Sequence, residues 1–385
     1  MKILIIGASA AGLSAAETIL KNESGNEVVI ISAENSFPYY RPVLSKYITD
    51  KTIITKSRFF LKEESWYAQN LELLKNTRAV EILPKKQMVE IQDNRKIPYD
   101  RLIIASGSLP FIPLPGAKDK RNVFALKTLS DANEIYKSLK KSKKVTIVGG
   151  GILGLEMADT INSQGKEVSV IELGNRLMPK MLDQASSEIL FSSVKKAGVN
   201  LYLNDVLEEL PGNKMPETIK LRSGKEIQTD MIIFAIGVRA DLKLVKDFIT
   251  TEKGIKVNCN METSSKNIFA CGDVISYKNL PALWMPALKT GMVAGSNAMG
   301  IKKDFEMDFY PAVFKGFSNS FFSIGDISPD NESIEKIGNG LYEKYFLREK
   351  KLLGAVLMGS ITKSSMVLNY LRNPGTIVNK KDLIK

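Results

Sequence analysis

Two glycine-rich turns, each placed directly after a short apolar segment, constrain the fold of this 385-residue chain more than any other feature. The first turn follows Lys2–Gly7 and the second follows Lys144–Gly149, and both apolar segments are predicted to be buried strands. Each turn continues through a helical stretch and a second strand to an acidic residue, Glu34 in the first copy and Glu172 in the second. This order predicts two βαβ units that bind dinucleotides. The alternative is an α/β fold with glycine-rich turns and no ligand, which two copies in the same context disfavour.

The residues of each turn suit a pyrophosphate group. The first Gly permits the tight turn, a small residue two positions later lets the backbone approach the phosphates, and the last Gly lets helix and strand pack closely. The phosphates bind free N–H groups at the helix N-terminus, and the later carboxylate binds a ribose hydroxyl. In the first copy Ser9 replaces the middle Gly, and serine is small enough to be tolerated. The predicted ligands are Gly7, Ser9, Ala11, Gly12 and Glu34 in the first unit, and Gly149, Gly151, Ile152, Leu153, Gly154 and Glu172 in the second.

The segments after each turn are repeated as well. A β-rich segment and then an apolar strand ending in small residues follow the first unit, with the strand at Tyr99–Gly107. The corresponding strand after the second unit is Thr229–Gly237, so a whole domain is duplicated rather than a short repeat. The predicted domains are a discontinuous one of residues 1–110 and 237–305, an inserted one of residues 111–236, and a C-terminal one of residues 306–385.

The C-terminal part of the chain has a different pattern. Leu341–Leu347 and Leu352–Leu357, joined by a short charged segment, are predicted to form a β-hairpin. Thr362–Leu371 is predicted to be a short amphipathic helix. These elements indicate a separate small α+β domain.

Composition limits the chemistry that the chain can perform. The chain contains no His and only two Cys, Cys259 and Cys271. This excludes His-dependent nucleophilic catalysis, the usual zinc sites and a disulfide-stapled fold, and no metal site is predicted. The scarcity of cysteine indicates a reducing compartment, so a cytoplasmic location is predicted. No apolar stretch is long enough to span a bilayer, so no membrane association is expected.

The net charge of the chain is +12, and its isoelectric point is near 9.3. Such a charge indicates a solvated basic surface, a patch that attracts an acidic partner, or nucleic-acid binding. No long block of Lys and Arg stands out, and no helix-turn-helix, zinc or RNA-binding signature is present. An acidic protein or an anionic cofactor is therefore favoured over nucleic acid.

Together these motifs resemble the FAD-dependent pyridine nucleotide-disulfide oxidoreductase superfamily. The first turn, the strand before Gly107 and the Gly272-Asp273 pair are similar to its FAD domain, and residues 111–236 are similar to its NAD domain. The resemblance implies an α/β fold with two Rossmann-like domains of the glutathione-reductase type, for FAD and NAD, plus a small C-terminal α+β domain. The loop Tyr39–Lys46, with the sequence YYRPVLSK, resembles the group of NADH:rubredoxin oxidoreductases and ferredoxin reductases.

The resemblance also assigns roles to individual residues. It implies FAD in the first unit and NADH in the second, where the Glu172 carboxylate would repel the 2′-phosphate of NADPH. In the resembling group a Lys after the RPxLS loop and a Glu on the second helix meet beside the flavin, which makes Lys46 and Glu156 the predicted catalytic pair. The alternative for this pair is a salt bridge at a domain interface. The further cofactor contacts predicted are Arg41, Lys46, Ser106, Gly107, Gly237, Gly272, Asp273 and Trp284. The alternative for Asp273 is the N-cap of a helix. The alternative for Trp284 is an aromatic side chain of the core.

The absence of Cys before Cys259 separates this chain from relatives with a redox cysteine in the Tyr39–Lys46 loop. The flavin would then pass electrons directly to an external acceptor. The leading hypothesis is an FAD-dependent NADH oxidoreductase that reduces a small acidic electron carrier, foremost rubredoxin. The alternatives are a ferredoxin reductase, a cysteine-independent NADH oxidase, and a non-enzymatic redox-sensing flavoprotein.

Overall fold

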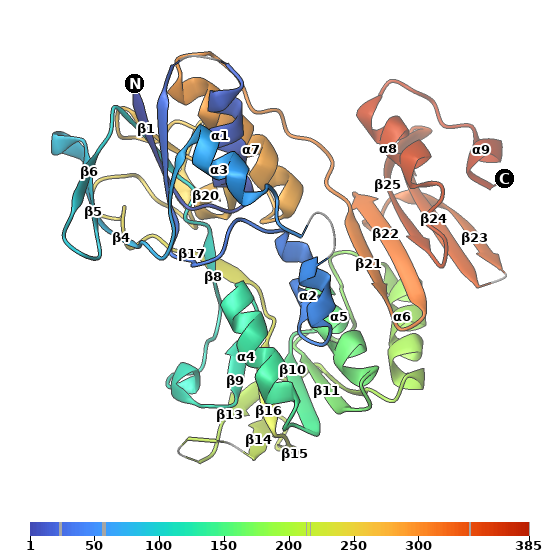
Figure 1. Ribbon diagram of the computed structural model, residues 1–385. Coiled ribbons are helices and arrows are strands. Elements are labelled where there is room, and N and C mark those ends of the chain that lie inside the picture. The colour runs from blue at the N-terminus through green and yellow to red at the C-terminus, as the bar shows by residue number, and fades with distance from the viewer. Residues whose placement is uncertain (23–24, 56–58, 213, 216, 339, 385) are drawn as a thin grey trace.

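A computed structural model describes residues 1–22, 25–55, 59–212, 214–215, 217–338 and 340–384 (Figure 1). Both apolar segments before the glycine-rich turns are central strands of parallel five-stranded sheets, as the sequence predicts. The first sheet has the order β19-β7-β1-β2-β3. Its strands are β1 (Lys2–Ile6), β2 (Glu27–Ile31), β3 (Glu72–Leu74), β7 (Arg101–Ile104) and β19 (Ile268–Ala270). Helices α1 (Ala10–Leu20) and α7 (Trp284–Ala298) pack against each other beside this sheet.

The second sheet repeats this arrangement with the order β12-β11-β10-β16-β9. Its strands are β9 (Val123–Ala125), β10 (Lys144–Val148), β11 (Glu167–Glu172), β12 (Asn200–Leu203) and β16 (Met231–Phe234). The accompanying helices are α4 (Leu129–Leu139), α5 (Ile152–Asn162) and α6 (Gln184–Lys196). In each unit the strand before the glycine-rich turn lies between the strand that carries the acidic residue and the strand of the duplicated apolar segment.

Each unit also carries a three-stranded antiparallel sheet, which accounts for the β-rich segments of the sequence. The two sheets consist of β4 (Ala79–Leu83), β5 (Met88–Ile91) and β6 (Lys96–Pro98), and of β13 (Leu207–Glu209), β14 (Thr218–Leu221) and β15 (Glu226–Gln228). The chain passes between the units twice, through β8 (Ser108–Pro110) and β17 (Val238–Ala240), which pair with each other. A short parallel pair, β18 (Ile255–Lys256) and β20 (Ile275–Ser276), completes the first unit.

The C-terminal part is an antiparallel sheet with helices, as expected for an α+β unit. Its order is β21-β22-β25-β24-β23. The strands are β21 (Ala312–Gly316), β22 (Asn319–Gly325), β23 (Glu332–Gly338), β24 (Leu341–Arg348) and β25 (Lys351–Met358), and the helices are α8 (Ser364–Arg372) and α9 (Lys380–Ile384). The predicted hairpin and helix are thus confirmed to within two residues.

One hydrophobic core joins the three parts of the molecule. It combines side chains of the second sheet with Leu44 and Tyr47 of the loop that follows the first unit, and with Phe314 and Tyr342 of the C-terminal sheet. That loop contains the short helical elements η1 (Arg41–Val43), α2 (Leu44–Tyr47) and η2 (Lys51–Thr55), and α3 (Glu64–Asn70) follows it. The remaining short helices are η3 (Pro84–Lys86), η4 (Ala117–Asp119) and η5 (Gly272–Val274). The C-terminal sheet accordingly lies beside α5 and α6 in Figure 1.

Candidate functional site

The two glycine-rich turns place helix N-termini where a pyrophosphate could bind. Ser9 caps α1 and Gly151 caps α5, both with extended backbone, and neither cap makes a side-chain hydrogen bond to the helix. The first N–H groups of both helices therefore remain available to an anion. The predicted ligands Ala11, Ile152 and Leu153 lie in these first turns.

Close approach of backbone explains the glycines. A Cβ atom on Gly12 would lie 1.8 Å from the carbonyl oxygen of Gly7, and one on Gly154 would lie 1.9 Å from that of Gly149. Any side chain at either position would push the helix away from its turn. The two turns are also alike in backbone conformation, because Gly7 has φ 112° and Gly149 has φ 118°. Both turns fit the geometry that a dinucleotide requires.

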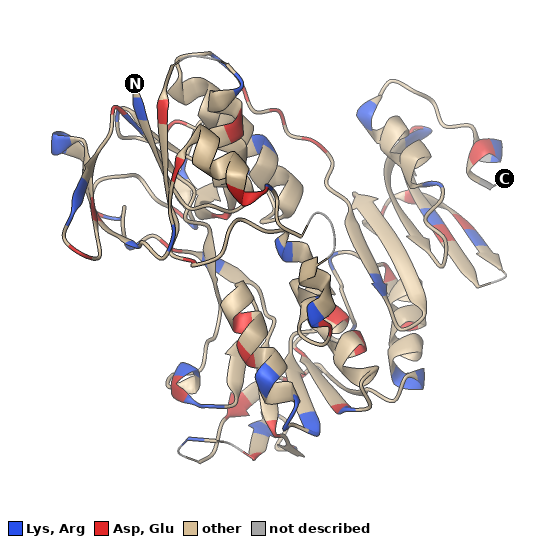
Figure 2. Cartoon of the chain, viewed as in Figure 1, with Lys and Arg blue, Asp and Glu red and all other residues tan. Residues whose placement is uncertain are grey.

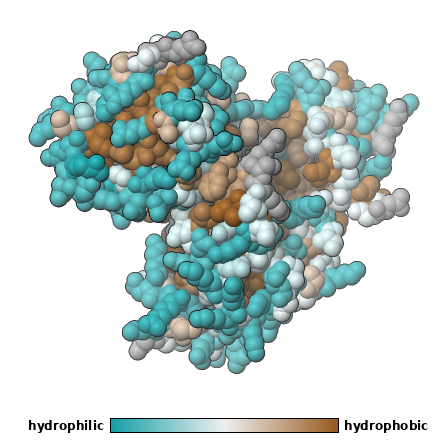
Figure 3. Space-filling view, in the orientation of Figure 1, coloured by the Kyte–Doolittle hydropathy of each residue, from teal (hydrophilic) through white to brown (hydrophobic). Residues whose placement is uncertain are grey.

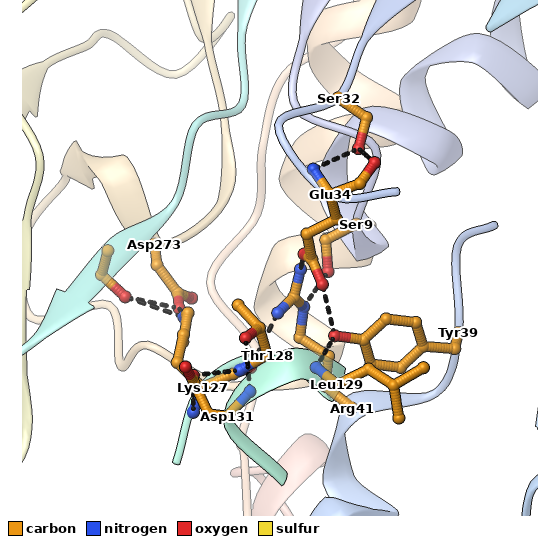
Figure 4. Close-up of polar contacts among 11 residues, drawn as sticks. Ser9, Ser32, Glu34, Tyr39, Arg41, Lys127, Thr128, Leu129, Asp131 and Asp273 are labelled. Atoms are coloured by element: carbon orange, nitrogen blue, oxygen red, sulfur yellow. Dashed lines mark hydrogen bonds and ion pairs between the residues drawn. The ribbon is translucent and has the colours of Figure 1, made fainter. Parts of the chain in front are cut away.

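Side chains surround the carboxylate of Glu34 in the first unit (Figure 4). The Tyr39 hydroxyl donates to Glu34 Oε2 at 2.6 Å, and Arg41 forms an ion pair with Glu34 Oε1. Arg41 Nε also donates to Ser9 Oγ at 2.8 Å, so its guanidinium group lies at the start of α1. Burial raises the pKa of Tyr39, which keeps the phenol neutral, and its oxygen accepts the N–H of Leu129 at 2.7 Å. The predicted ribose acceptor and the predicted phosphate contact are thus joined.

A second polar group, centred on Asp273, lies opposite this cluster in Figure 4. Lys127 Nζ is 3.2 Å from Asp273 Oδ2 and 3.0 Å from Ser108 Oγ, and Ser108 Oγ donates to the same carboxylate oxygen at 3.1 Å. Lys127 precedes α4, where Thr128 and Asp131 form a capping box that fixes the start of the helix. The carbonyl of Lys127 accepts Arg41 Nη1 at 2.7 Å, which connects the two groups.

Sequence reasoning did not single out Lys127 or Ser108. The available signals were the Thr128–Asp131 capping box, which fixes where a helix starts, and the small polar residue directly after Ser106-Gly107. Neither signal shows that these residues meet Asp273, which is 146 residues from Lys127 in the chain.

The acidic residue of the second unit has different surroundings. Glu172 Oε2 accepts the N–H of Gly150 at 2.7 Å, and Oε1 accepts the N–H of Gly174 at 2.7 Å. The nearby Arg176 donates to the carbonyl oxygens of Leu182 and Pro179, so its guanidinium group is held by backbone. Glu172 is therefore held by backbone N–H groups.

Ser45 contacts the predicted catalytic carboxylate. Ser45 Oγ donates to Glu156 Oε2 at 2.9 Å, because α2 packs against α5. Lys46 follows Ser45 and is exposed. Burial raises the pKa of Glu156, while the Ser45 hydrogen bond and the charge of Lys46 oppose that rise. The structure thus brings the predicted pair to one place, with Ser45 making the direct contact.

The remaining predicted contacts lie around these groups. Gly272 opens η5, where its N–H donates to Thr290 Oγ1 at 3.0 Å and its Cα faces Ala11 of α1. Ser106 and Gly107 directly precede β8, and the carbonyl of Gly237, directly before β17, accepts the N–H of Phe111. Gly237 therefore lies at the paired crossovers.

Trp284 begins α7 and meets the ring of Tyr40 edge to face, with ring centroids 5.0 Å apart. Its sequence neighbours Leu283 and Met285 are exposed by 43% and 53%. Figure 3 shows hydrophobic surface gathered at the centre of the view, where the parts of the molecule meet. Trp284 is half-buried and packs against the core of the first unit, next to Tyr40 of the Tyr39–Lys46 loop, as the core-aromatic alternative expects.

Neither cysteine is placed for redox chemistry. Cys271 is fully buried, and burial raises its pKa to about 12, so the reactive thiolate is suppressed. Cys259 is half-buried, and neither cysteine forms a disulfide. Within the described part of the chain, no group of three His, Cys, Asp or Glu side chains could hold a metal ion. In the same residues no helix is long and apolar enough to cross a membrane.

Comparison with protein families identifies two matches. Residues 1–291 match the family described as pyridine nucleotide-disulphide oxidoreductase. Residues 312–374 match the rubredoxin NAD+ reductase C-terminal domain. The first match covers both sheets with the glycine-rich turns, and the second covers all five strands of the C-terminal sheet and helix α8.

Individual relatives resemble the chain over nearly its full length. NADH-rubredoxin oxidoreductase of Clostridium acetobutylicum is 33% identical over 369 residues, which cover 94% of this chain and 92% of that protein. A crystal structure of the enzyme from that organism has a TM-score of 0.81 at 31% identity, covering 98% of this chain and 97% of the other. Nitrite reductase of Bacillus subtilis is 31% identical over 389 residues, which cover 98% of this chain and only 48% of that protein. The chain thus spans about half of one relative and nearly all of the other.

Proposed function

The chain belongs to the pyridine nucleotide-disulphide oxidoreductase family, and from this membership we propose that it oxidises NADH through bound FAD and passes the electrons to a small carrier protein. The observation that supports this most is the pair of nucleotide cradles with different surroundings. Charged side chains enclose the first, and backbone N–H groups border the acidic residue of the second. A permanently bound cofactor suits the first cradle, and a substrate that must leave suits the second.

FAD would be held by the first unit and by the polar groups of Figure 4. The N-terminus of α1 and Arg41 suit its pyrophosphate, Glu34 its adenosine ribose, and Asp273 its ribityl chain. Lys127 adds a second positive charge between the phosphate and ribityl positions. When bound, the flavin supplies the capacity to accept a hydride from NADH and to release two electrons singly.

NADH would occupy the second unit, with Glu172 accepting hydrogen bonds from the ribose hydroxyls. A 2′-phosphate would meet the Glu172 carboxylate, and the next basic residue in the sequence, Arg176, donates to carbonyl oxygens instead. Both features favour NADH over NADPH.

The residues beside the reacting groups would be Lys46 and Glu156. Lys46 would place a positive charge where the electron pair arrives, and Glu156, held by Ser45, would orient Lys46 and border the nicotinamide. No general base is required for hydride transfer.

The proposed acceptor is a one-electron carrier of the rubredoxin type. The C-terminal domain match and the name of the Clostridium relative support this class, and the charge of +12 favours an acidic member. The balance is simple: one NADH gives NAD+ and a proton, and two carrier molecules each gain one electron. Buried Cys271 and half-buried Cys259 give no support to a disulfide acceptor. The two unpaired thiols also fit a reducing cytoplasm, which we include in the proposal.

Anaerobic titration of the purified yellow protein with NADH tests the proposal, followed by addition of rubredoxin, ferredoxin or oxygen in separate experiments. We expect rapid loss of flavin absorbance with NADH, slow loss with NADPH, and fastest reoxidation by rubredoxin. Fastest reoxidation by ferredoxin would reassign the carrier, and fastest reoxidation by oxygen would make the protein an NADH oxidase. Slow reduction by NADH would favour a sensor, and a colourless protein that takes up no flavin would refute the assignment.

A further inference from the structure

We propose that a strip of lysines on η2, at the C-terminal end of α4 and in the segment that follows α4 is the docking surface for the acidic electron carrier. The lysine strip consists of Lys51, Lys137, Lys140, Lys141 and Lys143. This inference rests on the proposed function, and it adds where the partner binds. Figure 2 shows Lys and Arg residues gathered near the C-terminal end of α4.

The strip is an accessible excess of positive charge. Lys137, Lys140, Lys141 and Lys143 are exposed, and Lys51 is half-buried. None of the five forms an ion pair within the part of the chain that the structure describes. Lys144 differs, because it is half-buried and its Nζ donates to Gln228 Oε1 at 2.6 Å. Ser138, Leu139 and Ser142 interrupt these lysines, so the segment is not one uninterrupted basic block.

Tyr136 draws two lysines of the strip together. Lys51 Nζ lies 4.5 Å and Lys140 Nζ lies 4.8 Å from the centroid of the Tyr136 ring. The negative face of the ring attracts each ammonium group, while the two groups repel each other. An acidic side chain of a partner that approaches Tyr136 would be attracted by both ammonium groups. Tyr136 thus holds two cations of the strip next to one ring.

Acidic side chains on the same elements do not balance the strip. Asp131 is used in the capping box, where its carboxylate accepts backbone N–H groups. Glu134 is exposed on α4, and Asp50, beside Lys51, accepts hydrogen bonds from Thr52. Asp230, next to Lys143, accepts the backbone N–H groups of Lys143 and Lys144. The charge of Lys143 is partly balanced by Asp230, whereas Lys137, Lys140 and Lys141 are exposed and form no ion pair in the described residues.

Helix α4 connects the strip to the proposed flavin site. Leu129 at its N-terminal end contacts Tyr39, and Lys127, directly before the N-cap of the helix, contacts Asp273. One turn further, Asn133 Oδ1 accepts the hydroxyl of Tyr47, the neighbour of Lys46, at 3.0 Å. At a rise of about 1.5 Å per residue, Lys140 lies only about 10 Å along the helix from that contact.

A typical interface of about 800 Å² per partner is roughly 30 Å across. A carrier centred on the strip would therefore also reach Lys46, beside the proposed flavin edge. Electrostatic attraction to the strip would speed the encounter and weaken as salt rises.

The test compares two charge reversals of equal size. Lys140→Glu/Lys141→Glu changes the strip, and Lys85→Glu/Lys86→Glu changes two exposed lysines on η3 of the first unit. We measure the dissociation constant of an acidic rubredoxin at low and high salt, with a basic cytochrome c as the opposite-charge probe. Flavin content, melting temperature and the rate of flavin reduction by NADH serve as checks that folding and the nucleotide sites are intact.

We expect the strip variant to bind rubredoxin at least about tenfold more weakly at low salt, with a smaller salt dependence, and to bind cytochrome c more tightly. The η3 variant should resemble the wild type. Equal weakening in both variants would show that only net charge matters, and an unchanged strip variant would place docking elsewhere; either overturns the inference. So does a strip variant that loses affinity for duplex DNA but retains rubredoxin.

Two further controls keep the outcome decisive. If the strip variant has a lower melting temperature or flavin content, Lys140→Gln/Lys141→Gln replaces it, with Lys85→Gln/Lys86→Gln as its control and a smaller loss expected. If the wild type itself binds no rubredoxin at low salt, the proposed function is wrong as regards the carrier. If the wild type binds rubredoxin and the strip variant binds it with the same dissociation constant, only this inference fails.

Discussion

The two βαβ units share a turn geometry but differ in what surrounds the acidic residue. Glu34 of the first unit is bound by the side chains of Tyr39 and Arg41, and Arg41 continues to Ser9 at the helix start. Glu172 of the second unit is bound by backbone N–H groups of its own turn, and the nearby Arg176 is turned to carbonyl oxygens. The same fingerprint is thus equipped with long cationic side chains in one unit and without them in the other.

This difference suggests how the same βαβ motif could hold one nucleotide tightly in the first unit and exchange another in the second. Charge-assisted hydrogen bonds from Arg and Lys hold a phosphate more strongly than neutral ones. Contacts from loops of both units, at Arg41 and Lys127, would also have to open before the first ligand could leave. In the described part of the second unit, Glu172 accepts hydrogen bonds from two backbone N–H groups, which would suit binding and release in each turnover.

Replacing the last glycine of each turn should have the largest effect, because it should abolish ligand binding in that unit alone. Gly12→Ala is expected to abolish FAD binding, and Gly154→Ala to abolish NADH binding while FAD is retained. The reason is the same in both, because the new Cβ would lie less than 2 Å from a backbone oxygen of the turn. Absorbance spectra and NADH titration measure the two outcomes. A Gly154→Ala protein without flavin would show that the units are not independent.

Lys46→Met should leave both ligands bound and slow the reaction between them. Loss of one positioned charge or donor typically lowers such a rate by about 100-fold. Stopped-flow reduction of the flavin by NADH gives the rate, and Lys46→Arg is the control that keeps the charge. An unchanged rate in Lys46→Met would refute the catalytic role of Lys46, and the described residues show no ion pair between Lys46 and Glu156 that would support the salt-bridge alternative.

Arg41→Gln should weaken FAD binding, because it removes from the first unit a cationic side chain that the described part of the second unit lacks around its acidic residue. The proposed charge-assisted contact between Arg41 and the FAD pyrophosphate is lost, and at about 1.5–3 kcal/mol for one such bond the dissociation constant of FAD should rise about 10–100-fold. Equilibrium dialysis with free FAD measures it. Arg176→Gln is the matched variant, expected to lower the melting temperature without changing the affinity for NADH. Unchanged FAD retention in Arg41→Gln would contradict the assigned role.

Glu172→Gln should narrow the preference between the two nicotinamide cofactors. The neutral amide no longer repels a 2′-phosphate, so the ratio of kcat/KM for NADH over NADPH should fall about tenfold, which corresponds to about 1.4 kcal/mol. Steady-state assays with both cofactors measure the ratio. Glu167→Gln, at the other end of β11, serves as the control and should not change it.

The smallest effect is expected from Ser45→Ala. The hydrogen bond from Ser45 lowers the pKa of Glu156 against the rise caused by burial, so its loss raises that pKa further. Because the charged carboxylate is the form that orients Lys46, the rate of flavin reduction should fall at a higher pH than in the wild type. Ser45→Thr keeps a hydroxyl and should restore the profile. An unchanged acid limb would mean that Glu156 does not control the rate.

The glycine-rich turns, their acidic residues and the duplicated strands could be predicted from the sequence, because their spacing is local. The hairpin of β24 and β25 was predictable for the same reason. The contact between Lys127 and Asp273 was not, because it depends on the second unit returning to the first. The hydrogen bond from Ser45 to Glu156 could not be predicted either, because only the packing of α2 on α5 brings the two side chains together.

The hydrophobic core that joins α2, the second sheet and the C-terminal sheet limits how this protein can be divided. An excised nucleotide-binding module would leave Leu44 and Phe314 without their apolar neighbours, although its two connections run side by side. Chimeras between relatives should therefore transfer the loop at Tyr39–Lys46, the inserted module and the C-terminal sheet together. Evolution faces the same restriction, since a change in one of the three must suit the other two.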